Sequence, residues 1–262
     1  MDLQLTDKLA LVSGSTAGIG FAIAQALANE GANVIINGRT QKAVDLALDK
    51  LKNATGKVYG FAGDLSLASV AETLAKQFPE VDILVNNLGI FEPKPFLEIP
   101  DEDWQRFFDV NVLSGVRLSK LYLPRMQQNN WGRIIFISSE SAIQIPAEMI
   151  HYGMTKTAQI SVARGLAELV AGTGITVNSV LPGPTSSRGV VDFVDTLAKS
   201  QNKTAAEFEK EFFEKVRPTS LIKRFATPEE VAALVAYVAS PLASATTGAA
   251  LRVDGGTIKS AF

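Results

Sequence analysis

The chain has 262 residues and a formal net charge of −2. That length fits one large domain with a substantial core, or at most two small ones. The nearly balanced charge gives no indication of binding to nucleic acid or to an anionic membrane. The chain lacks cysteine and has one histidine, His151, which excludes disulfides and thiol catalysis and argues against a metal site. Residues 1–14 lack the apolar stretch of a signal peptide, and a cytoplasmic location is expected.

Seven short, apolar runs rich in β-branched residues recur along the chain. They lie at 9–13, 33–37, 57–62, 82–87, 133–138, 175–181 and 249–254. Most are continuous rather than alternating, which is typical of strands covered on both faces of a parallel sheet. The stretches between them have helical spacing, so the sequence predicts an open α/β sheet with right-handed crossovers.

One polar helical stretch, at about 186–225, interrupts this alternation. It is too long for a plain crossover between two strands. We interpret it as an insertion within a single domain spanning 1–262. Because it follows a strand, we expect it to cover the carboxyl ends of the strands as a substrate lid.

A glycine-rich turn with Gly14, Gly18 and Gly20 joins the first strand to the first helix. Glycines allow a sharp bend and close approach of a ligand, and the free N–H groups of a helix start suit a pyrophosphate. The alternative is a purely structural turn. At the end of the second strand, Gly38 stands where NAD-binding folds usually place an acid. Arg39 follows and would suit a 2′-phosphate, although a solvated arginine at a helix start is the alternative.

At this point the sequence resembles the short-chain dehydrogenase/reductase family over nearly its whole length. The motifs that carry the resemblance are 14–20 (GSTAGIG), Asp64-Leu65, 86–89 (NNLG), Asn111, Ser139, 152–156 (YGMTK), 182–184 (PGP) and 253–256 (VDGG). Leu88 departs from the alanine usual in that family. The resemblance implies a single-domain Rossmann fold, doubly wound, with a mostly parallel seven-stranded sheet and helices on both faces. It also implies a homodimer or homotetramer and members similar to 3-oxoacyl-acyl-carrier-protein reductases and carbonyl reductases.

The same resemblance implies a nicotinamide cofactor and the residues that bind it. These are Gly14, Ser15, Thr16, Gly18, Ile19, Gly20, Arg39, Asp64, Leu65, Asn87, Leu88, Gly89, Tyr152, Lys156, Pro182, Gly183 and Thr185. Asp64 is expected at the adenine, Asn86 near the ribose and Thr185 at the nicotinamide amide. We expect a preference for NADP(H), with NAD(H) as the alternative.

Ser139, Tyr152, Lys156 and Asn111 match the catalytic tetrad of the family. The spacing of four residues places Tyr152 and Lys156 on one helical face. A phenol is a poor acid or base near neutral pH, and a nearby ammonium would lower its pKa. Ser139 could hydrogen-bond the substrate oxygen, and Asn111 could support a water chain from Lys156. His151 is expected to serve packing or an interface.

The substrate pocket is expected to be apolar, since it should draw on the segments around the predicted site. We expect its lining to include Phe91, Phe96, Ile143, Ile145, Val190, Val191 and Phe193. Glu140 and Glu148 are interpreted as solvated or structural. The sequence therefore predicts hydride transfer between NADP(H) and a hydrophobic ketone or secondary alcohol.

Three other functions stay open from the sequence. A 3-oxoacyl-carrier or -CoA reductase is one, although Asn130 and Thr173 stand where relatives place carrier-binding arginines, and Arg133 precedes a strand. A nucleotide-binding sensor without turnover is another, and a methyltransferase on a similar sheet is the third. The complete Ser–Tyr–Lys set argues against the sensor, and the YGMTK element argues against the methyltransferase.

Overall fold

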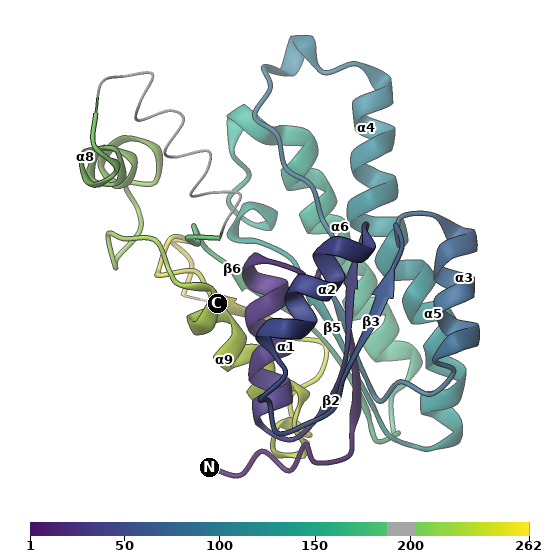
Figure 1. The fold of residues 1–262 in the computed structure, drawn as a ribbon. Helices are drawn as coiled ribbons and strands as arrows, with labels where there is room; N and C mark the ends of the chain where they lie inside the picture. Colours follow the sequence, from purple (N-terminus) through teal and green to yellow (C-terminus); the bar gives the residue numbers. More distant parts are fainter. Residues whose placement is uncertain (188–202, 262) are drawn as a thin grey trace.

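A computed structural model describes residues 1–187 and 203–261 of the chain. Within them, seven parallel strands form one sheet in the order β3-β2-β1-β4-β5-β6-β7 (Figure 1). The strands are β1 Leu9–Val12, β2 Asn33–Gly38, β3 Val58–Ala62, β4 Ile83–Asn86, β5 Gly132–Ile137, β6 Ile175–Pro182 and β7 Ala250–Val253. Each overlaps one of the seven apolar runs, so the predicted doubly wound sheet is confirmed.

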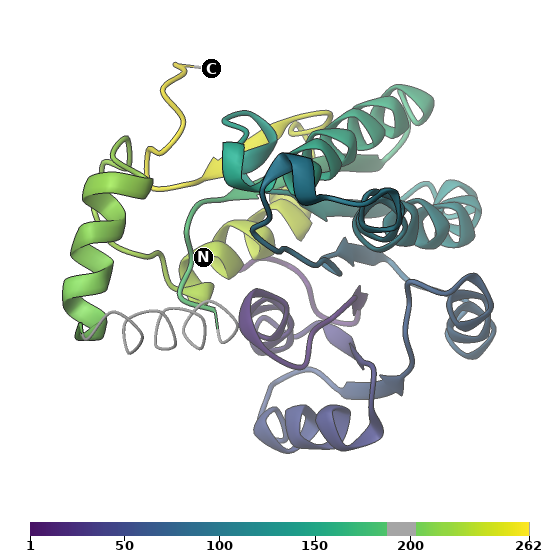
Figure 2. The same ribbon diagram turned by 90° about the horizontal axis from the view of Figure 1, so that it is seen from above.

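Helices alternate with the strands along the chain. They are α1 Gly18–Asn29, α2 Gln41–Lys50, α3 Ala68–Gln77, α4 Asp101–Phe108, α5 Ser114–Gln128, α6 Ile150–Leu169, α8 Ala205–Glu211 and α9 Pro228–Ala239. Helices α1, α2 and α9 cover one face of the sheet, and α3, α5 and α6 cover the other (Figures 1 and 2). This two-sided cover explains why the strands read as continuous apolar runs.

Successive residues of the inner strands β1, β2, β4 and β5 enter different cores. In β1, Ala10 and Val12 pack against α1 and α9, whereas Leu11 packs on the opposite face. In β5, Ile135 joins the first core and Phe136 the second. The period of two along a strand therefore divides these inner runs between two hydrophobic layers.

The topology places the functional end of the molecule at the carboxyl ends of the strands. Strand β1 pairs with β2 on one side and with β4 on the other. The chain first winds outward through β2 and β3, and then crosses back to β4. Ligands of open α/β sheets bind at such a reversal, outside the carboxyl ends.

The described part of the predicted insertion stands beyond these carboxyl ends. It contains α8 and a π-helical turn, η5, at Phe212–Val216 (Figures 1 and 2). Its two ends are joined, because Thr185 forms a parallel bridge with Ala226 and Ser186 N–H donates to the Ala226 carbonyl at 2.8 Å. Across the described residues, no helix is both long and apolar enough to cross a membrane.

Candidate active site

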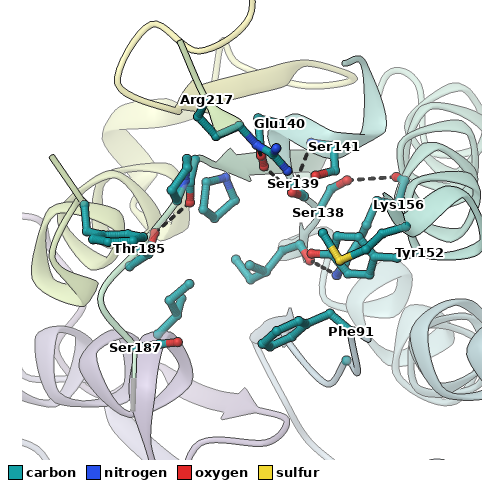
Figure 3. A pocket seen from close by; sticks show the side chains of 18 of the residues that line it. Phe91, Ser138, Ser139, Glu140, Ser141, Tyr152, Lys156, Thr185, Ser187 and Arg217 are labelled. Carbon is teal, nitrogen blue, oxygen red and sulfur yellow. Dashed lines mark hydrogen bonds and ion pairs between the residues drawn. The ribbon is translucent and has the colours of Figure 1, made fainter. Parts of the chain in front are cut away.

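A cavity of about 470 Å³ opens at the carboxyl ends of β4, β5 and β6, beneath α8 and η5 (Figure 3). Many residues predicted to bind cofactor or substrate line it. They are Ile19, Asn87, Gly89, Phe91, Ser139, Tyr152, Lys156, Pro182, Gly183 and Thr185. These residues come from five separate parts of the chain.

Ser139, Tyr152 and Lys156 meet at one wall of this cavity (Figure 3). Ser139 follows β5 and caps the short 3-10 helix η3, Glu140–Ala142, by accepting a hydrogen bond from Ser141 N–H. Tyr152 and Lys156 lie one turn apart in α6, as their spacing predicts. Lys156 Nζ lies 5.6 Å from the centre of the Tyr152 ring.

The pKa of Tyr152 lies above its ordinary value in this structure. Burial is the main cause, and the carboxylate of Glu140 adds to it. The nearby Ser139 hydroxyl and the positive charge of Arg217 act in the opposite direction. Ser139 and Arg217 are the groups that favour the phenolate here, and the lowering of the Tyr152 pKa by Lys156 stays a prediction.

Lys156 is itself perturbed, since burial lowers its pKa to about 8. Its ammonium donates to the carbonyl of Ile137 at 3.0 Å and to Oε1 of Gln159 at 3.2 Å. Nε2 of Gln159 then donates to the carbonyl of Asn111 at 2.6 Å. The sequence reasoning missed Gln159, although its position three residues after Lys156 places it on the same face of α6.

Asn111 lies behind the cavity, in a π-helical turn, η2 Asp109–Leu113, between α4 and α5. Such turns interrupt the regular ladder and are frequent at functional sites. The Asn111 side chain accepts from Ile90 N–H at 2.8 Å and donates to Thr155 Oγ1 at 3.0 Å. It therefore fastens the loop after β4 to α6, while Gln159 stands between Asn111 and Lys156.

The glycine turn fits a dinucleotide phosphate. Gly14 and Gly18 have φ of 62° and 57°, which favours glycine, and a Cβ on Gly20 would come within 2.5 Å of the Gly14 carbonyl. Helix α1 has no side-chain cap on its first N–H groups and no acid in its first turn. An anion would satisfy these free donors, so the turn is shaped and charged as a phosphate cradle.

Two asparagines, the buried Asn37 and the half-buried Asn87, hold this cradle in place. Oδ1 of Asn37 accepts from Gly14 N–H at 3.0 Å, and Nδ2 of Asn87 donates to the carbonyls of Ser13 and Gly14 at 2.9 and 3.1 Å. Asn37 was not singled out from the sequence. Its position as a polar residue directly after the apolar run of a buried strand is the signal that could have found it.

The remaining predicted cofactor residues occupy the edges of the site. Arg39 is exposed after β2, and Leu65 is buried after β3. Asp64 accepts from Ser66 N–H at 3.0 Å, which shapes the turn there. The placement of Asn86 near the ribose is corrected, since its amide donates to Ser119 Oγ of α5 at 3.2 Å, inside the protein.

The other residues of the cradle pack behind the cavity. Ser15 and Thr16 belong to the turn between β1 and α1, and Ser15 Oγ donates to the Val12 carbonyl at 2.7 Å. Leu88 packs against the core and lies 3.5 Å from the Cβ position of Gly14. Its bulk, unusual for the family that the sequence resembles, therefore supports the turn.

The predicted apolar lining is correct only in part. Phe91 lines the cavity and contacts the Tyr152 ring edge to face. Phe96, Ile143 and Ile145 do not line it, and each is about half exposed, at 55%, 48% and 49%. Val190, Val191 and Phe193 lie outside the described residues. The apolar wall comes instead from Met149, Phe208, Phe212, Val216 and Phe225.

A buried ion pair in the cavity wall was also missed. Glu140 is only 5% exposed, so it is not solvated. Its Oε2 accepts from Ser139 Oγ at 2.5 Å, and its Oε1 lies 3.4 Å from Nε of Arg217 (Figure 3). A second guanidinium nitrogen of Arg217 reaches Glu148 at 3.1 Å. Arg217 was not singled out because it lies far along the chain.

His151 is packed, as expected, rather than directed into the cavity. It is fully buried, with its ring 4.0 Å from that of Phe107 and 5.9 Å from that of Trp104. Burial lowers its pKa. The neutral imidazole thus packs as an aromatic ring between α4 and α6.

Arg133 is also internal. It belongs to β5, is 2% exposed and donates to the carbonyls of Gly132, Gly174 and Ser240. The guanidinium ties three chain segments together at the amino end of the sheet. It therefore offers no exposed charge to an acidic carrier protein.

With this geometry in hand, comparison with known proteins decides the family. A family model described as enoyl-(acyl carrier protein) reductase matches residues 14–257. The chain is 51% identical to an uncharacterized oxidoreductase, YvaG, of Bacillus subtilis (strain 168), over all of both chains. It is 36% identical to dehydrogenase/reductase SDR family member 4 of Caenorhabditis elegans, covering 95% of this chain and 94% of that protein. The chain belongs to the short-chain dehydrogenase/reductase family.

Solved structures of short-chain dehydrogenases/reductases agree closely with this one. An L-sorbose reductase from Gluconobacter frateurii, complexed with NADPH and L-sorbose, is 30% identical with a TM-score of 0.93, over 99% of this chain and 100% of that one. A 7α-hydroxysteroid dehydrogenase complexed with NADH and 7-oxo glycochenodeoxycholic acid is 29% identical with a TM-score of 0.85, over 99% of this chain and 97% of that one. This protein is accordingly an NAD(P)-dependent oxidoreductase that acts on CH–OH and C=O groups.

Proposed function

We propose that the protein is an NADP(H)-dependent reductase of ketones, and in reverse a dehydrogenase of secondary alcohols. The observation that carries the proposal is the convergence of Ser139, Tyr152 and Lys156 on a cavity that adjoins the glycine turn. The aromatic wall of that cavity supports a substrate with an apolar part.

In the proposed reaction, bound NADPH would supply the hydride that reduces the carbonyl carbon. Tyr152 donates its phenolic proton to the carbonyl oxygen as negative charge develops there, which yields the alcohol. Ser139 and the positively charged Lys156 stabilise that developing charge and the phenolate that follows. Lys156 is held in place by the carbonyl of Ile137 and by Gln159, and a proton from solvent restores Tyr152.

The preference for NADPH over NADH is proposed from the end of β2. A Cβ on Gly38 would lie 2.4 Å from Cγ2 of Thr16, so an acidic side chain has no room at this position. Arg39 follows with an exposed side chain, suited to a 2′-phosphate. The L-sorbose reductase structure contains NADPH, which agrees with this proposal.

The segment around α8 is proposed to act as a substrate lid. Phe208, Phe212 and Arg217 from this segment line the cavity, and the bridge between Thr185 and Ala226 fixes its base. The family resemblance adds the proposals of a homodimer or homotetramer and of a cytoplasmic location. Sedimentation of the purified protein would test the assembly.

The 3-oxoacyl reductase alternative receives support from relatives such as the FabG protein of Aquifex aeolicus, 34% identical over 98% of this chain. The internal position of Arg133 weighs against carrier-protein docking at that residue. A panel containing simple ketones and 3-oxoesters separates the two substrate classes.

The test of the proposed mechanism is Tyr152→Phe. We expect kcat with any accepted ketone to fall at least about 100-fold, because the proton donor is lost. The Kd for NADPH, measured by fluorescence titration, should stay unchanged. Near-normal turnover in Tyr152→Phe would contradict the mechanism. If the unsubstituted protein binds NADPH but turns over no ketone of the panel, the alternative of a nucleotide-binding sensor would be favoured.

A further inference from the structure

The single proton of the Ser139 hydroxyl is already committed in this structure. Ser139 Oγ donates to Glu140 Oε2 at 2.5 Å and accepts from Ser141 N–H at 3.1 Å. A hydroxyl has one proton to donate. A plain ketone oxygen therefore has to compete with a buried carboxylate for the hydrogen bond from Ser139.

Glu140 is built into the wall rather than free to swing away. Its carboxylate is buried, and Arg217 of the lid segment holds Oε1 from above (Figure 3). If Ser139 stopped donating to Glu140 and no other group replaced it, one carboxylate oxygen would lose its hydrogen-bond donor in a buried site. Such a loss is unfavourable in free energy. A substrate that brings its own donor would remove this cost.

We propose that Glu140 is a specificity-determining residue that selects neutral α-hydroxy ketones with an apolar substituent, and vicinal diols in the reverse direction; this rests on the reductase function proposed above. The substrate hydroxyl donates to Glu140 Oε2 in place of Ser139. The Ser139 hydroxyl is then free to donate its hydrogen bond to the neighbouring carbonyl oxygen, beside Tyr152. Two oxygens on adjacent carbons are spaced much like hydrogen-bonded partners, which matches the close pair formed by Ser139 and Glu140.

The charges and shape of the cavity fit the same class of substrate. Glu140 and Glu148 supply two carboxylates and Arg217 one guanidinium, all on the cavity wall. An oxo acid would place a further negative charge beside them, which is unfavourable. The apolar substituent would face Phe208 and Phe212.

The test compares matched phenyl ketones with NADPH as reductant. Hydroxymethyl phenyl ketone carries the donor, and methoxymethyl phenyl ketone has a similar oxygen without the proton. Methyl phenyl ketone lacks the oxygen, and phenylglyoxylate carries a carboxylate. We expect kcat/KM for the hydroxy ketone to exceed that for the methoxy ketone about 100-fold. A site that accepts a hydrogen bond from the substrate hydroxyl discriminates against an analogue that lacks this proton. Phenylglyoxylate should be the poorest substrate.

Two variants assign this discrimination to Glu140. In Glu140→Leu the hydroxy-to-methoxy ratio should fall to within about threefold, while turnover of methyl phenyl ketone persists because Ser139 is released. Should the leucine variant not fold, Glu140→Gln provides a neutral isostere, with a ratio reduced at least about tenfold. The matched control is Glu148→Gln, which alters the other partner of Arg217 without contact to Ser139 and should keep the ratio.

The outcomes separate this inference from the function beneath it. Equal kcat/KM for the hydroxy and methoxy ketones in the unsubstituted protein would overturn the inference and leave the reductase proposal standing. A high ratio that survives Glu140→Leu would also overturn it. Tight NADPH binding with no turnover of any of the four ketones would overturn both.

Discussion

The buried ammonium of Lys156 gives a prediction at the scale of a single residue. Its pKa is lowered to about 8, below the ordinary value of 10.5. Between these values the unfolded chain binds a proton that the folded protein releases. The free energy of unfolding should therefore rise with pH from about 8, by about 1.4 kcal/mol per unit at most. The rise should end near pH 10, where the unfolded chain begins to release the Tyr152 proton that the folded protein retains.

The measurement is urea denaturation of the protein without nucleotide across this pH range, for the unsubstituted protein and for Lys156→Met. Methionine has similar length and no charge. The methionine variant should lose the rise, and the difference between the two curves isolates Lys156 from other titrating groups. Parallel curves would show that Lys156 stays fully protonated in the folded protein.

At the scale of single elements, the sequence predicted best what depends on local pattern. The seven strands are marked by apolar runs. Helix α9 begins with Thr227 and Pro228, residue types that are typical of a helix start, and the structure has a capping box there. The glycine turn is marked in the same way, because positive φ at Gly14 and Gly18 restricts the residue type.

The parts of the site that the sequence did not predict depend on contacts between distant segments. Arg217 meets Glu140 only because the lid segment returns over the end of β5. Glu140 alone looks like any surface acid, and burial separates it from Glu148 only in the folded chain. Ile143 and Ile145 were misplaced for the same reason, since apolar character near Ser139 does not specify which side chains face the cavity.

Two capping boxes of the same kind allow a matched prediction about helices. Thr227 caps α9, which packs under the sheet against α1, and Thr204 caps the short α8 of the lid segment. Thr227→Ala should reduce the free energy of unfolding by about 1 kcal/mol, since the helix start loses its acceptor within the cooperative core. This corresponds to a fall in Tm of about 2–4 °C.

Thr204→Ala should leave the global transition unchanged, because α8 buries no side chain fully and lies outside the two cores. Its effect should appear as faster limited proteolysis near residues 203–217. Calorimetry and a protease time course on both variants provide the comparison. Equal losses of Tm in the two variants would mean that α8 unfolds together with the sheet.

At the scale of the whole molecule, the layers explain why one cavity can serve both cofactor and substrate. The reversal of strand order at β1 and β4 opens the edge of the sheet where the glycine turn lies, and β5 and β6 continue the same edge toward α8. The cofactor residues thus come from both halves of the chain, from the glycine turn to Thr185, and most of the apolar wall comes from the second. Binding of NADPH should stabilise the entire fold, because it joins these halves.

This coupling turns cofactor preference into a stability measurement. At a concentration 100 times its Kd, NADPH should raise the free energy of unfolding by about 2.7 kcal/mol, or Tm by about 5–10 °C. In Arg39→Ala, measured at the same concentration, the stabilisation should fall to about 1 kcal/mol or less, since charge-assisted bonds to the 2′-phosphate are lost. The smaller shift caused by NADH should not change.

The reciprocal variant takes the packing of Gly38 into account. Gly38→Asp with Arg39→Ile supplies an acid for the ribose hydroxyls, but the new Cβ would clash with the Thr16 methyl group. Adding Thr16→Ala removes that methyl group, so the triple variant should be stabilised more by NADH than by NADPH. If NADPH stabilises Arg39→Ala as much as the unsubstituted protein, another residue binds the 2′-phosphate. The triple variant would then retain its preference for NADPH.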